Sequence, residues 1–430
     1  MASVYDKLCE HSKALLSYQK ALEIKQKSLP ENHPSLATSY NNIAKMYYNI
    51  GQYTEALSFF QIALEIYKKI PTENHPSLIN CYNNIGEMHR SMGEYSQALS
   101  FHKKTLENRE KFLPSNHPDL AQSFNNIGLV HHNMGQYSDA LSFHQKALEI
   151  REKALPSNHS DVAQSYNNIG SAYHSMGQYS EALLCYRKAL EIREEILAPN
   201  HLDLANSYNN IGGVLDDQGE YSNALLFYNK ALEIHRKTLP SNPCSIAISY
   251  NNIGEAYRGL EKYSEALEFH QKALEIREEN LRENHSELAQ SYNNIGLVYH
   301  KMGQNSEALI FHQRALEIRE KTLTPNHSDL ANSYNNIASV FDDQREYSKA
   351  LSLYNKALEI YKKTLPPNHS SFAISWNNIA SVYYNIGKYS DALASFECAL
   401  GIWQRSLPAE HPYIQTARNN IELVKKTYYK

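Results

Sequence analysis

The 430-residue chain lacks several features that mark common functional classes. No apolar run approaches the roughly 18 to 20 residues that span a bilayer, and the N-terminus lacks the hydrophobic core of a secretion signal, so we expect a cytoplasmic protein without membrane contact. The 42 basic residues are scattered among 46 acidic ones, and the formal net charge is -4. Because binding to phosphate backbones normally requires clustered Lys and Arg, nucleic acid is not an expected partner.

Cysteine is scarce, and the cysteines do not form matched pairs. Each occupies a different position of the sequence repeat described below: Cys9, Cys81, Cys185, Cys244 and Cys398. They are therefore predicted to be reduced thiols without metal. The chain also lacks a glycine-rich phosphate loop, a nucleophile elbow and any Ser/His/Asp set outside the repeat register. We expect no enzyme activity and no cofactor.

What the chain does contain is one motif that recurs at a fixed interval. The letters SYNNIG occur at 165–170, 207–212, 249–254 and 291–296, and the Asn pair within them recurs every 42 residues without insertion or deletion. The first Asn of the pair stands at 41, 83, 125, 167, 209, 251, 293, 335, 377 and 419. A sustained period of this length identifies a repeat protein.

Each repeat predicts a first helix and a turn. In the first full repeat, Tyr40, Ile43, Ala44 and Tyr47 fall on one side of a helix. Gly51 follows, and glycine occupies seven of the ten equivalent positions. Since glycine adopts positive φ at little cost, we expect a tight turn at this position.

The second helix of each repeat carries alanine at all ten equivalent positions, from Ala14 to Ala392, which predicts a close approach of two helices. Segments such as LPSNHP at 113–118 end this helix and begin the next one. Such a hairpin has two apolar sides and must stack on its neighbours. The predicted fold is therefore all-α, a solenoid of antiparallel helix pairs.

The repeats resemble the tetratricopeptide family. The pattern W-x2-I-A-x2-Y at 376–383, followed by A-x3-F at 392–396, is similar to the family signature W-x2-L-G-x2-Y and A-x3-F. The unit is about eight residues longer than the basic family repeat and is most similar to the tetratricopeptide region of kinesin light chains. The resemblance implies a right-handed superhelix whose concave groove binds peptides. The heptad coiled coil of kinesin light chains has no counterpart in this sequence.

We expect one repeat domain over residues 1–430. It comprises a partial repeat over 1–30, nine full repeats over about 34–411 and a capping helix over about 412–430. Met1 aligns with Ile43, one repeat later, so the chain begins inside a first helix. This start suggests an alternative to a scaffold, in which the chain is the repeat tail of a larger multidomain enzyme or signalling protein with its catalytic domain upstream.

A block of three repeats is predicted to be a duplication. The segment DLANSYNNIGGVLDDQGEYSNALLFYNKALEI at 203–234 returns in closely similar form at 329–360, a shift of 126 residues. Growth by copying whole repeats favours a long binding surface over a single catalytic pocket.

The Asn pairs are the main candidates for a binding site. The aromatic, Ile and Ala/Gly positions of the first helix point into the stack. The first Asn and the residues four and seven positions after it therefore lie on the opposite face of that helix. The resemblance to the tetratricopeptide family implies that this face lines the concave groove. A carboxamide offers donors and an acceptor that match the amide edge of an extended peptide. Alternatively, one Asn of each pair hydrogen-bonds between neighbouring helices, and we expect both roles, one per Asn. The predicted peptide-binding groove comprises Asn41, Asn83, Asn84, Arg90, Asn125, Asn126, Asn167, Asn168, Asn209, Asn210, Asp216, Asn251, Asn252, Arg258, Asn293, Asn294, Asn335, Asn336, Asp342 and Asn377.

Charged groove positions vary between repeats and are predicted to add specificity. Asp216 and Asp342 each precede a second Asp, and we expect basic or mixed ligand segments near them. Acidic segments are expected near Arg90 and Arg258. Solvated surface charge is the alternative for each of these residues. The expected partners are other proteins, bound through peptide segments, and the sequence leaves the oligomeric state open.

A histidine recurs in the loops between repeats. These residues are His33, His75, His117, His159, His201, His285, His327, His369 and His411. Equivalent loops should lie at least one helix-packing distance apart, about 8 to 10 Å, which is too far for a shared zinc ion. We therefore expect them to cap helices or pack in the loops.

Overall fold

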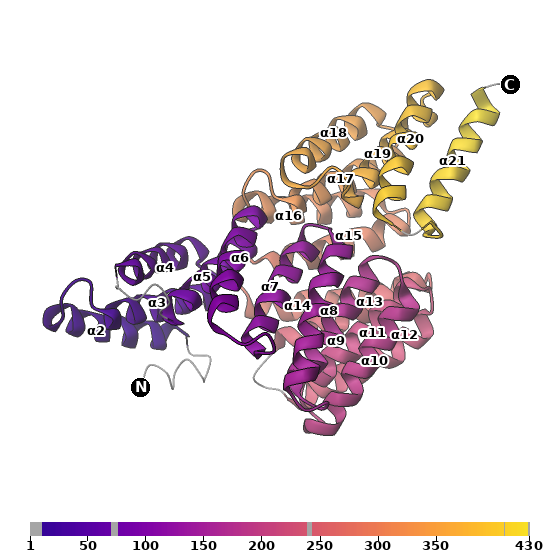
Figure 1. Ribbon diagram of the computed structural model, residues 1–430. Coiled ribbons are helices and arrows are strands. Elements are labelled where there is room, and N and C mark those ends of the chain that lie inside the picture. The colour runs from indigo at the N-terminus through magenta and orange to yellow at the C-terminus, as the bar shows by residue number, and fades with distance from the viewer. Residues whose placement is uncertain (1–10, 70–75, 239–242, 408, 429–430) are drawn as a thin grey trace. The chain divides into compact units, whose positions relative to one another are not determined.

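The computed structural model describes residues 11–69, 76–238, 243–407 and 409–428, and almost all of these residues are helical (Figure 1). The predicted all-α fold is confirmed, with 20 helices and no strand in this part of the chain. The helices are α2 (His11–Ser28), α3 (Pro34–Asn49), α4 (Tyr53–Lys68), α5 (Pro76–Ser91), α6 (Tyr95–Phe112), α7 (Pro118–Asn133), α8 (Tyr137–Ala154), α9 (Ser160–Ser175), α10 (Tyr179–Ile196), α11 (Leu202–Asp217), α12 (Tyr221–Lys237), α13 (Pro243–Gly259), α14 (Tyr263–Asn280), α15 (Ser286–Lys301), α16 (Asn305–Thr322), α17 (Ser328–Asp343), α18 (Tyr347–Thr364), α19 (Ser370–Asn385), α20 (Tyr389–Ser406) and α21 (Pro412–Tyr428).

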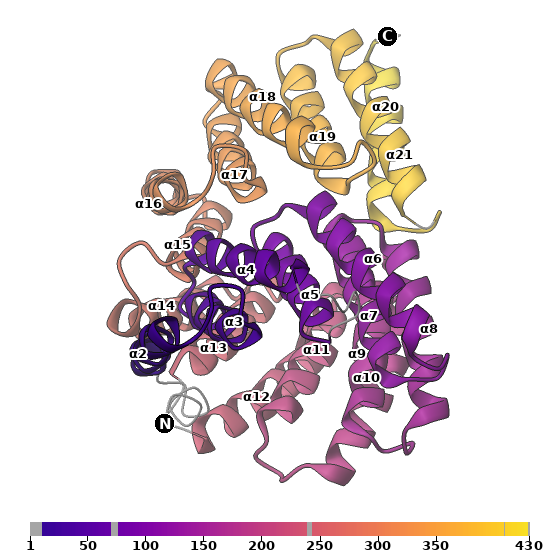
Figure 2. The same ribbon diagram turned by 60° about the vertical axis from the view of Figure 1, so that its left-hand side comes forward.

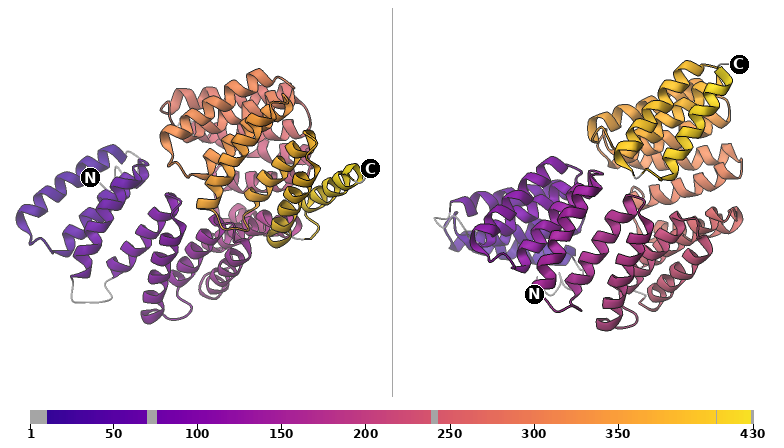
Figure 3. Two further views of the ribbon diagram at one scale, coloured as in Figure 1. Left: turned by 90° about the horizontal axis from the view of Figure 1, so that it is seen from above. Right: turned by 45° about the vertical axis from the view of Figure 1, so that its right-hand side comes forward.

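The helices alternate between the two types that the sequence predicts. Odd-numbered helices carry the Asn pairs, and the even-numbered helices that follow carry the recurrent alanine. Within a repeat the two helices lie side by side, as Figures 2 and 3 also show. None of the described helices is both long and apolar enough to cross a bilayer.

The described helices fall into two compact units, α2–α8 and α9–α21. The core of the first unit gathers Ile43, Phe60 and Ile85 from three successive helices. In the second unit, the largest cluster includes Tyr361 and Trp403. Each core forms because the apolar stripe of one hairpin is covered by the next hairpin in the chain.

The predicted turn between the two helices of a repeat is confirmed. All seven turn glycines have positive φ, between 71° and 83°. Glu261 and Arg345 occupy the same turn with φ of 59° and 61°, so two repeats place a residue with a Cβ atom in the left-handed region. This region is unfavourable for such residues.

The close approach at the recurrent alanine is also confirmed. Each such alanine within the described residues is fully buried, from Ala14 to Ala392. A second close approach lies one turn further along the even helix, where a ring covers a small residue of the odd helix. A Cβ atom on Gly254, for example, would lie 2.8 Å from the His270 ring.

The loop histidines cap the odd-numbered helices, as predicted. In each case the imidazole Nδ1 accepts a hydrogen bond from the backbone N–H two residues later, at 3.1 to 3.3 Å. The capping residues are His33, His117, His159, His201, His285, His327, His369 and His411. The predictions at Met1, Cys9 and His75 fall outside the described residues.

Candidate functional site

The Asn pairs of neighbouring repeats are hydrogen-bonded to each other. Nδ2 of the second Asn in one repeat donates to Oδ1 of the first Asn in the preceding repeat, and we call this row of bonds the Asn ladder. Its rungs are Asn84–Asn41 (3.1 Å), Asn126–Asn83 (2.8 Å), Asn210–Asn167 (2.7 Å), Asn294–Asn251 (2.7 Å), Asn336–Asn293 (2.7 Å) and Asn420–Asn377 (3.4 Å). Inter-helix hydrogen bonding by these residues is therefore confirmed. It uses both members of a pair, so the expectation that only one Asn of each pair has this structural role is wrong.

The ladder leaves each carboxamide with further capacity. A first Asn uses its oxygen in a rung, and a second Asn uses its nitrogen, so a rung occupies only one end of each group. At Asn126 the other end is also occupied, because its Oδ1 accepts a hydrogen bond from Gln122 Nε2 at 2.7 Å. Asn125, Asn126, Asn168, Asn251, Asn294 and Asn335 are buried. The other predicted groove residues are half-buried: Asn41, Asn83, Asn84, Arg90, Asn167, Asn209, Asn210, Asp216, Asn252, Arg258, Asn293, Asn336, Asp342 and Asn377. Peptide binding by these residues stays a prediction.

Within the second unit the ladder has two gaps. No rung joins Asn252 to Asn209, whose buried Oδ1 has no hydrogen-bond partner in the described structure. No rung joins Asn378 to Asn335 either, because Asn335 bonds elsewhere. Its Nδ2 donates to the Tyr361 hydroxyl (3.4 Å) and to Ser375 Oγ (3.1 Å), and its Oδ1 accepts from Ser375 Oγ (3.2 Å).

A second row of polar contacts, not predicted from the sequence, crosses from several even helices to the odd helices that follow them. A guanidinium Nη1 donates to a serine Oγ in the pairs Arg109–Ser123 (2.9 Å), Arg193–Ser207 (2.7 Å), Arg277–Ser291 (2.6 Å) and Arg319–Ser333 (2.7 Å). Burial lowers the pKa of each of these arginines, although they remain cationic. The sequence signal for these pairs is an arginine followed 14 residues later by a serine. At the equivalent positions of the last even helix and α21 the two residues are Trp403 and Ala417, so both members of the pair are replaced there.

The two groove arginines are paired within their own helices. Arg90 Nη2 lies 2.8 Å from Glu87 Oε2, and Arg258 Nη2 lies 2.6 Å from Glu255 Oε2. Burial opposes ionisation of Glu87, but hydrogen bonds from His102 and Arg90 outweigh it and lower its pKa to about 2. Each arginine thus faces a neutralising partner, and the expected preference for acidic segments stays a prediction.

The two groove aspartates differ from each other. Burial, followed by the negative charges of Glu255 and Asp217, raises the pKa of Asp216 to about 6. Burial also raises the pKa of Asp342, but this carboxylate accepts a hydrogen bond from Asn385 Nδ2 at 3.2 Å. Asp216 Oδ1 is buried without a hydrogen-bond partner in the described structure. Asp216 is therefore the least satisfied carboxyl of the predicted groove residues.

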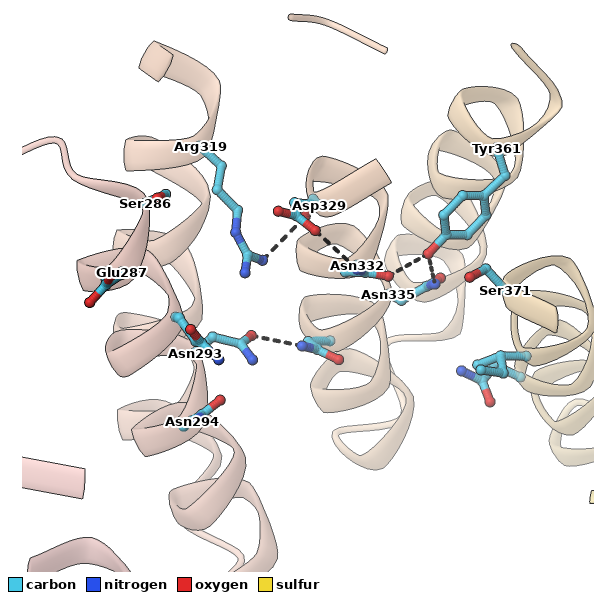
Figure 4. Close-up of a pocket in the computed structure, with 14 residues that line it drawn as sticks. Ser286, Glu287, Asn293, Asn294, Arg319, Asp329, Asn332, Asn335, Tyr361 and Ser371 are labelled. Atoms are coloured by element: carbon cyan, nitrogen blue, oxygen red, sulfur yellow. Dashed lines mark hydrogen bonds between the residues drawn. The ribbon is translucent and has the colours of Figure 1, made fainter. Parts of the chain in front are cut away.

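The asparagine face is hollowed into a pocket of about 600 Å³ between α15, α17 and α19 (Figure 4). Asn293 and Asn294 line one side of the pocket, Arg319 lies at one end, and Asn335 and Tyr361 line the other side. Within the described residues, no group of three or more His, Cys, Asp or Glu side chains is placed to hold a metal ion. The chemistry of this face is therefore hydrogen bonding by carboxamides.

Comparison with protein families agrees with this arrangement. The tetratricopeptide repeat model matches residues 35–111, 119–195, 161–237, 245–321 and 287–363, and a second tetratricopeptide repeat model matches residues 373–413. The chain belongs to the tetratricopeptide repeat family. Repeats of this family generally serve as non-catalytic interaction scaffolds. No curated protein matches the chain in sequence.

Solved structures of similar fold include an aspartyl phosphate phosphatase and a Rap protein. Aspartyl phosphate phosphatase F from Bacillus subtilis is 16% identical, with a TM-score of 0.53 over 89% of this chain and 95% of that chain. A Rap protein complexed with competence and sporulation factor is 14% identical, with a TM-score of 0.51 over 81% of this chain and 98% of that chain. The nearly identical repeats of a Podosopora anserina putative kinesin light chain are 22% identical, with a TM-score of 0.42 over 48% of this chain and 99% of that chain.

Proposed function

We propose that this tetratricopeptide repeat chain is a scaffold that binds extended peptide segments of other proteins along the asparagine face of its odd-numbered helices. The observation that carries the proposal is the Asn ladder, which places carboxamides at a constant interval and uses only one end of each carboxamide in a rung. An extended peptide exposes N–H and C=O groups that such carboxamides bind without requiring a particular side chain. The Rap protein of similar fold was solved with competence and sporulation factor, so an array of this kind is able to hold a bound partner.

The spacing of the ladder suits an extended peptide. Packed helices lie about 8 to 10 Å apart, and an extended chain rises about 3.3 Å per residue, so each repeat would meet about every third residue of the ligand. The rungs also fix the orientation of the carboxamides before a ligand arrives. Because less side-chain freedom is then lost on association, the entropic cost of binding is lower.

The proposal is tested by panning a displayed library of random 12-residue peptides against the full chain. The enriched peptides are then measured by fluorescence anisotropy against a variant with Asn167→Ala, Asn210→Ala and Asn251→Ala. We expect their affinity to fall at least tenfold. A matched control replaces three exposed asparagines of even helices with alanine, namely Asn223, Asn229 and Asn280, and should change the affinity less than twofold.

Circular dichroism must first show that both variants keep the helical content of the parent. A library that yields no enriched peptide contradicts peptide binding. Enriched peptides that bind the parent and both variants equally place the binding surface elsewhere and contradict the role of the asparagine face.

A further inference from the structure

The pocket between α15, α17 and α19 combines many carboxamides with a balance of charge. Seven of its lining side chains are Asn or Gln. Its charged lining residues are Arg319, Glu287 and Asp329. Glu287 Oε2 lies 3.2 Å from Nε of Arg277, a buried arginine behind the pocket, and this pair neutralises the carboxylate. The single remaining cation and the single remaining anion cancel, so the pocket has no net attraction for either sign of charge.

Two groups of the pocket are free of the contacts that their counterparts make elsewhere. In α9, Gln164 Nε2 donates to Asn168 Oδ1 (2.8 Å), and Arg193 Nη2 donates to Gln164 Oε1 (3.3 Å). The counterparts of Gln164 and Arg193, 126 residues later, are Gln290 and Arg319. Among the described residues Gln290 has no hydrogen bond, and Arg319 uses only Nη1, for Ser333 Oγ and the Asp329 carbonyl.

Asn378 is free for a reason that the sequence explains. Its ladder acceptor would be Asn335, but the hydroxyls of Tyr361 and Ser375 occupy Asn335. The Tyr361 hydroxyl in turn donates to Asn332 Oδ1 at 2.6 Å, which holds the ring at the edge of the pocket (Figure 4). Five of the other repeats have an arginine at the position of Tyr361, and Arg109, Arg193, Arg277 and Arg319 among them are bonded to serine. The Asn84–Asn41 rung forms although Tyr67 stands at the position equivalent to Tyr361, so it is Tyr361 and Ser375 together that open the ladder beside the pocket.

We infer that this pocket binds an uncharged, extended stretch of a ligand peptide, whose backbone carbonyls accept hydrogen bonds from Gln290, Arg319 and Asn378. The inference rests on the proposed peptide binding and names the part of the face where a ligand is held most tightly. A donor without a protein partner exchanges only water for the ligand on binding, whereas a donor already bonded within the protein must first break that bond. An Asp, Glu, Lys or Arg side chain in the same place would be desolvated without a matching charge, which is unfavourable.

The test uses the peptides enriched against the full chain and two double variants. The pocket variant is Gln290→Ala with Asn378→Ala. The matched control is Gln271→Ala with Asn280→Ala, which removes the same side-chain types from exposed positions of α14, an even-numbered helix outside the asparagine face. We expect the pocket variant to weaken peptide binding at least tenfold and the control less than threefold. Circular dichroism checks that both variants are folded.

A charge scan of the same peptides supplies a second readout. Each peptide residue is replaced in turn by Glu and by Lys. We expect one run of about three positions at which both replacements weaken binding to the parent at least tenfold, and at which neither has a further effect on the pocket variant. A run at which Glu or Lys strengthens binding would overturn the inference, as would equal affinities of the pocket variant and its control.

Failure of the inference is distinguishable from failure of the proposed function. If no peptide is enriched, peptide binding itself fails. If enriched peptides lose affinity for the variant lacking Asn167, Asn210 and Asn251 but not for the pocket variant, the asparagine face binds peptide and only the assignment to this pocket is wrong.

Discussion

Residues 203–234 and 329–360, the two copies of the duplicated segment, are closely similar in sequence. The side chains that neighbour equivalent residues nevertheless differ between the two copies. In the first copy, Asp216 lies near Glu255 of the following repeat, and its pKa rises to about 6. In the second copy, Asp342 lies beside Asn385 instead and receives a hydrogen bond from it. The same aspartate is therefore poorly satisfied in one copy and bonded in the other.

The difference continues into the interior. The first copy places His270 over Gly254, and the imidazole is fully buried. The equivalent positions of the second copy hold Phe396 and Ala380, which are apolar. Because each repeat is completed by its neighbour, a residue's chemistry in such an array is set as much by the next repeat as by its own. Four experiments test this comparison.

The largest effect is expected from Tyr361→Ala. Tyr361 is 1% exposed, packs near Phe372 and exchanges hydrogen bonds with two asparagines. Loss of the ring leaves a cavity and unsatisfied carboxamides, so we expect the free energy of unfolding to fall by about 3 to 5 kcal/mol. Urea unfolding followed by circular dichroism measures this. His235→Ala, at the equivalent position of the first copy, should cost less because the removed ring is smaller, and an equal or greater cost would contradict the comparison.

A smaller effect, dependent on pH, is expected from His270→Phe. Burial lowers the pKa of His270 to about 4. Between about pH 6.5 and 4 the unfolded chain takes up a proton at this residue and the folded chain does not, so stability is complete above that window and is lost as the pH falls through it. We expect the variant to gain roughly 2 to 3 kcal/mol at pH 4 relative to its difference from the parent at pH 7.5.

Urea unfolding of the parent and the His270→Phe variant at both pH values provides the measurement. Phenylalanine already occupies the matching position at Phe396, which makes it the appropriate substitute. If parent and variant lose stability equally on acidification, His270 does not remain neutral in the folded chain.

The opposite pH dependence is expected from Asp216→Asn. The folded pKa of Asp216 is about 6, above its ordinary value, so its contribution is complete below about pH 3.8 and is lost as the pH rises through 6. Because the side chain is only half-buried, we expect the variant to be more stable than the parent by about 1 to 2 kcal/mol at pH 8 and by nothing at pH 4. Asp342→Asn should gain less, since Asn385 already stabilises that carboxylate. Equal gains at the two sites would remove the difference between the copies.

The smallest effect concerns the turn that precedes the second helix. Arg345 has φ of 61°, whereas Gly219, its counterpart in the first copy, has φ of 77° and no neighbouring atom within reach of an added Cβ. We expect Arg345→Gly to raise the free energy of unfolding by up to about 1 kcal/mol and Gly219→Ala to lower it by about 1 kcal/mol. Thermal unfolding of both variants against the parent resolves these changes, and shifts of the same sign would be inconsistent with strain at Arg345.

Local sequence rules predict most of the fold but only part of the candidate site. The turn at Gly219, the close contact at Ala224 and the cap at His201 follow from properties of single residues, and the structure confirms all three. Asn336 and Asn378 have the same immediate neighbour, yet only Asn336 forms a rung. The difference arises because Tyr361 and Ser375 together occupy Asn335, and a partner such as Tyr361, which belongs to another helix, cannot be read from a local pattern.

The Asn ladder also bears on how the chain could have grown. Every rung joins Nδ2 of a second Asn to Oδ1 of a first Asn. A repeat with the Asn pair therefore carries both the donor and the acceptor from which a rung to a neighbouring repeat is made. A block of repeats copied by recombination within the gene would therefore join its new neighbours without a mismatch at the seam. The copied segments at 203–234 and 329–360 are consistent with such an event, because each is joined to the preceding repeat by a rung, Asn210–Asn167 and Asn336–Asn293. The rung to the following repeat is missing after both copies, at Asn209 and at Asn335.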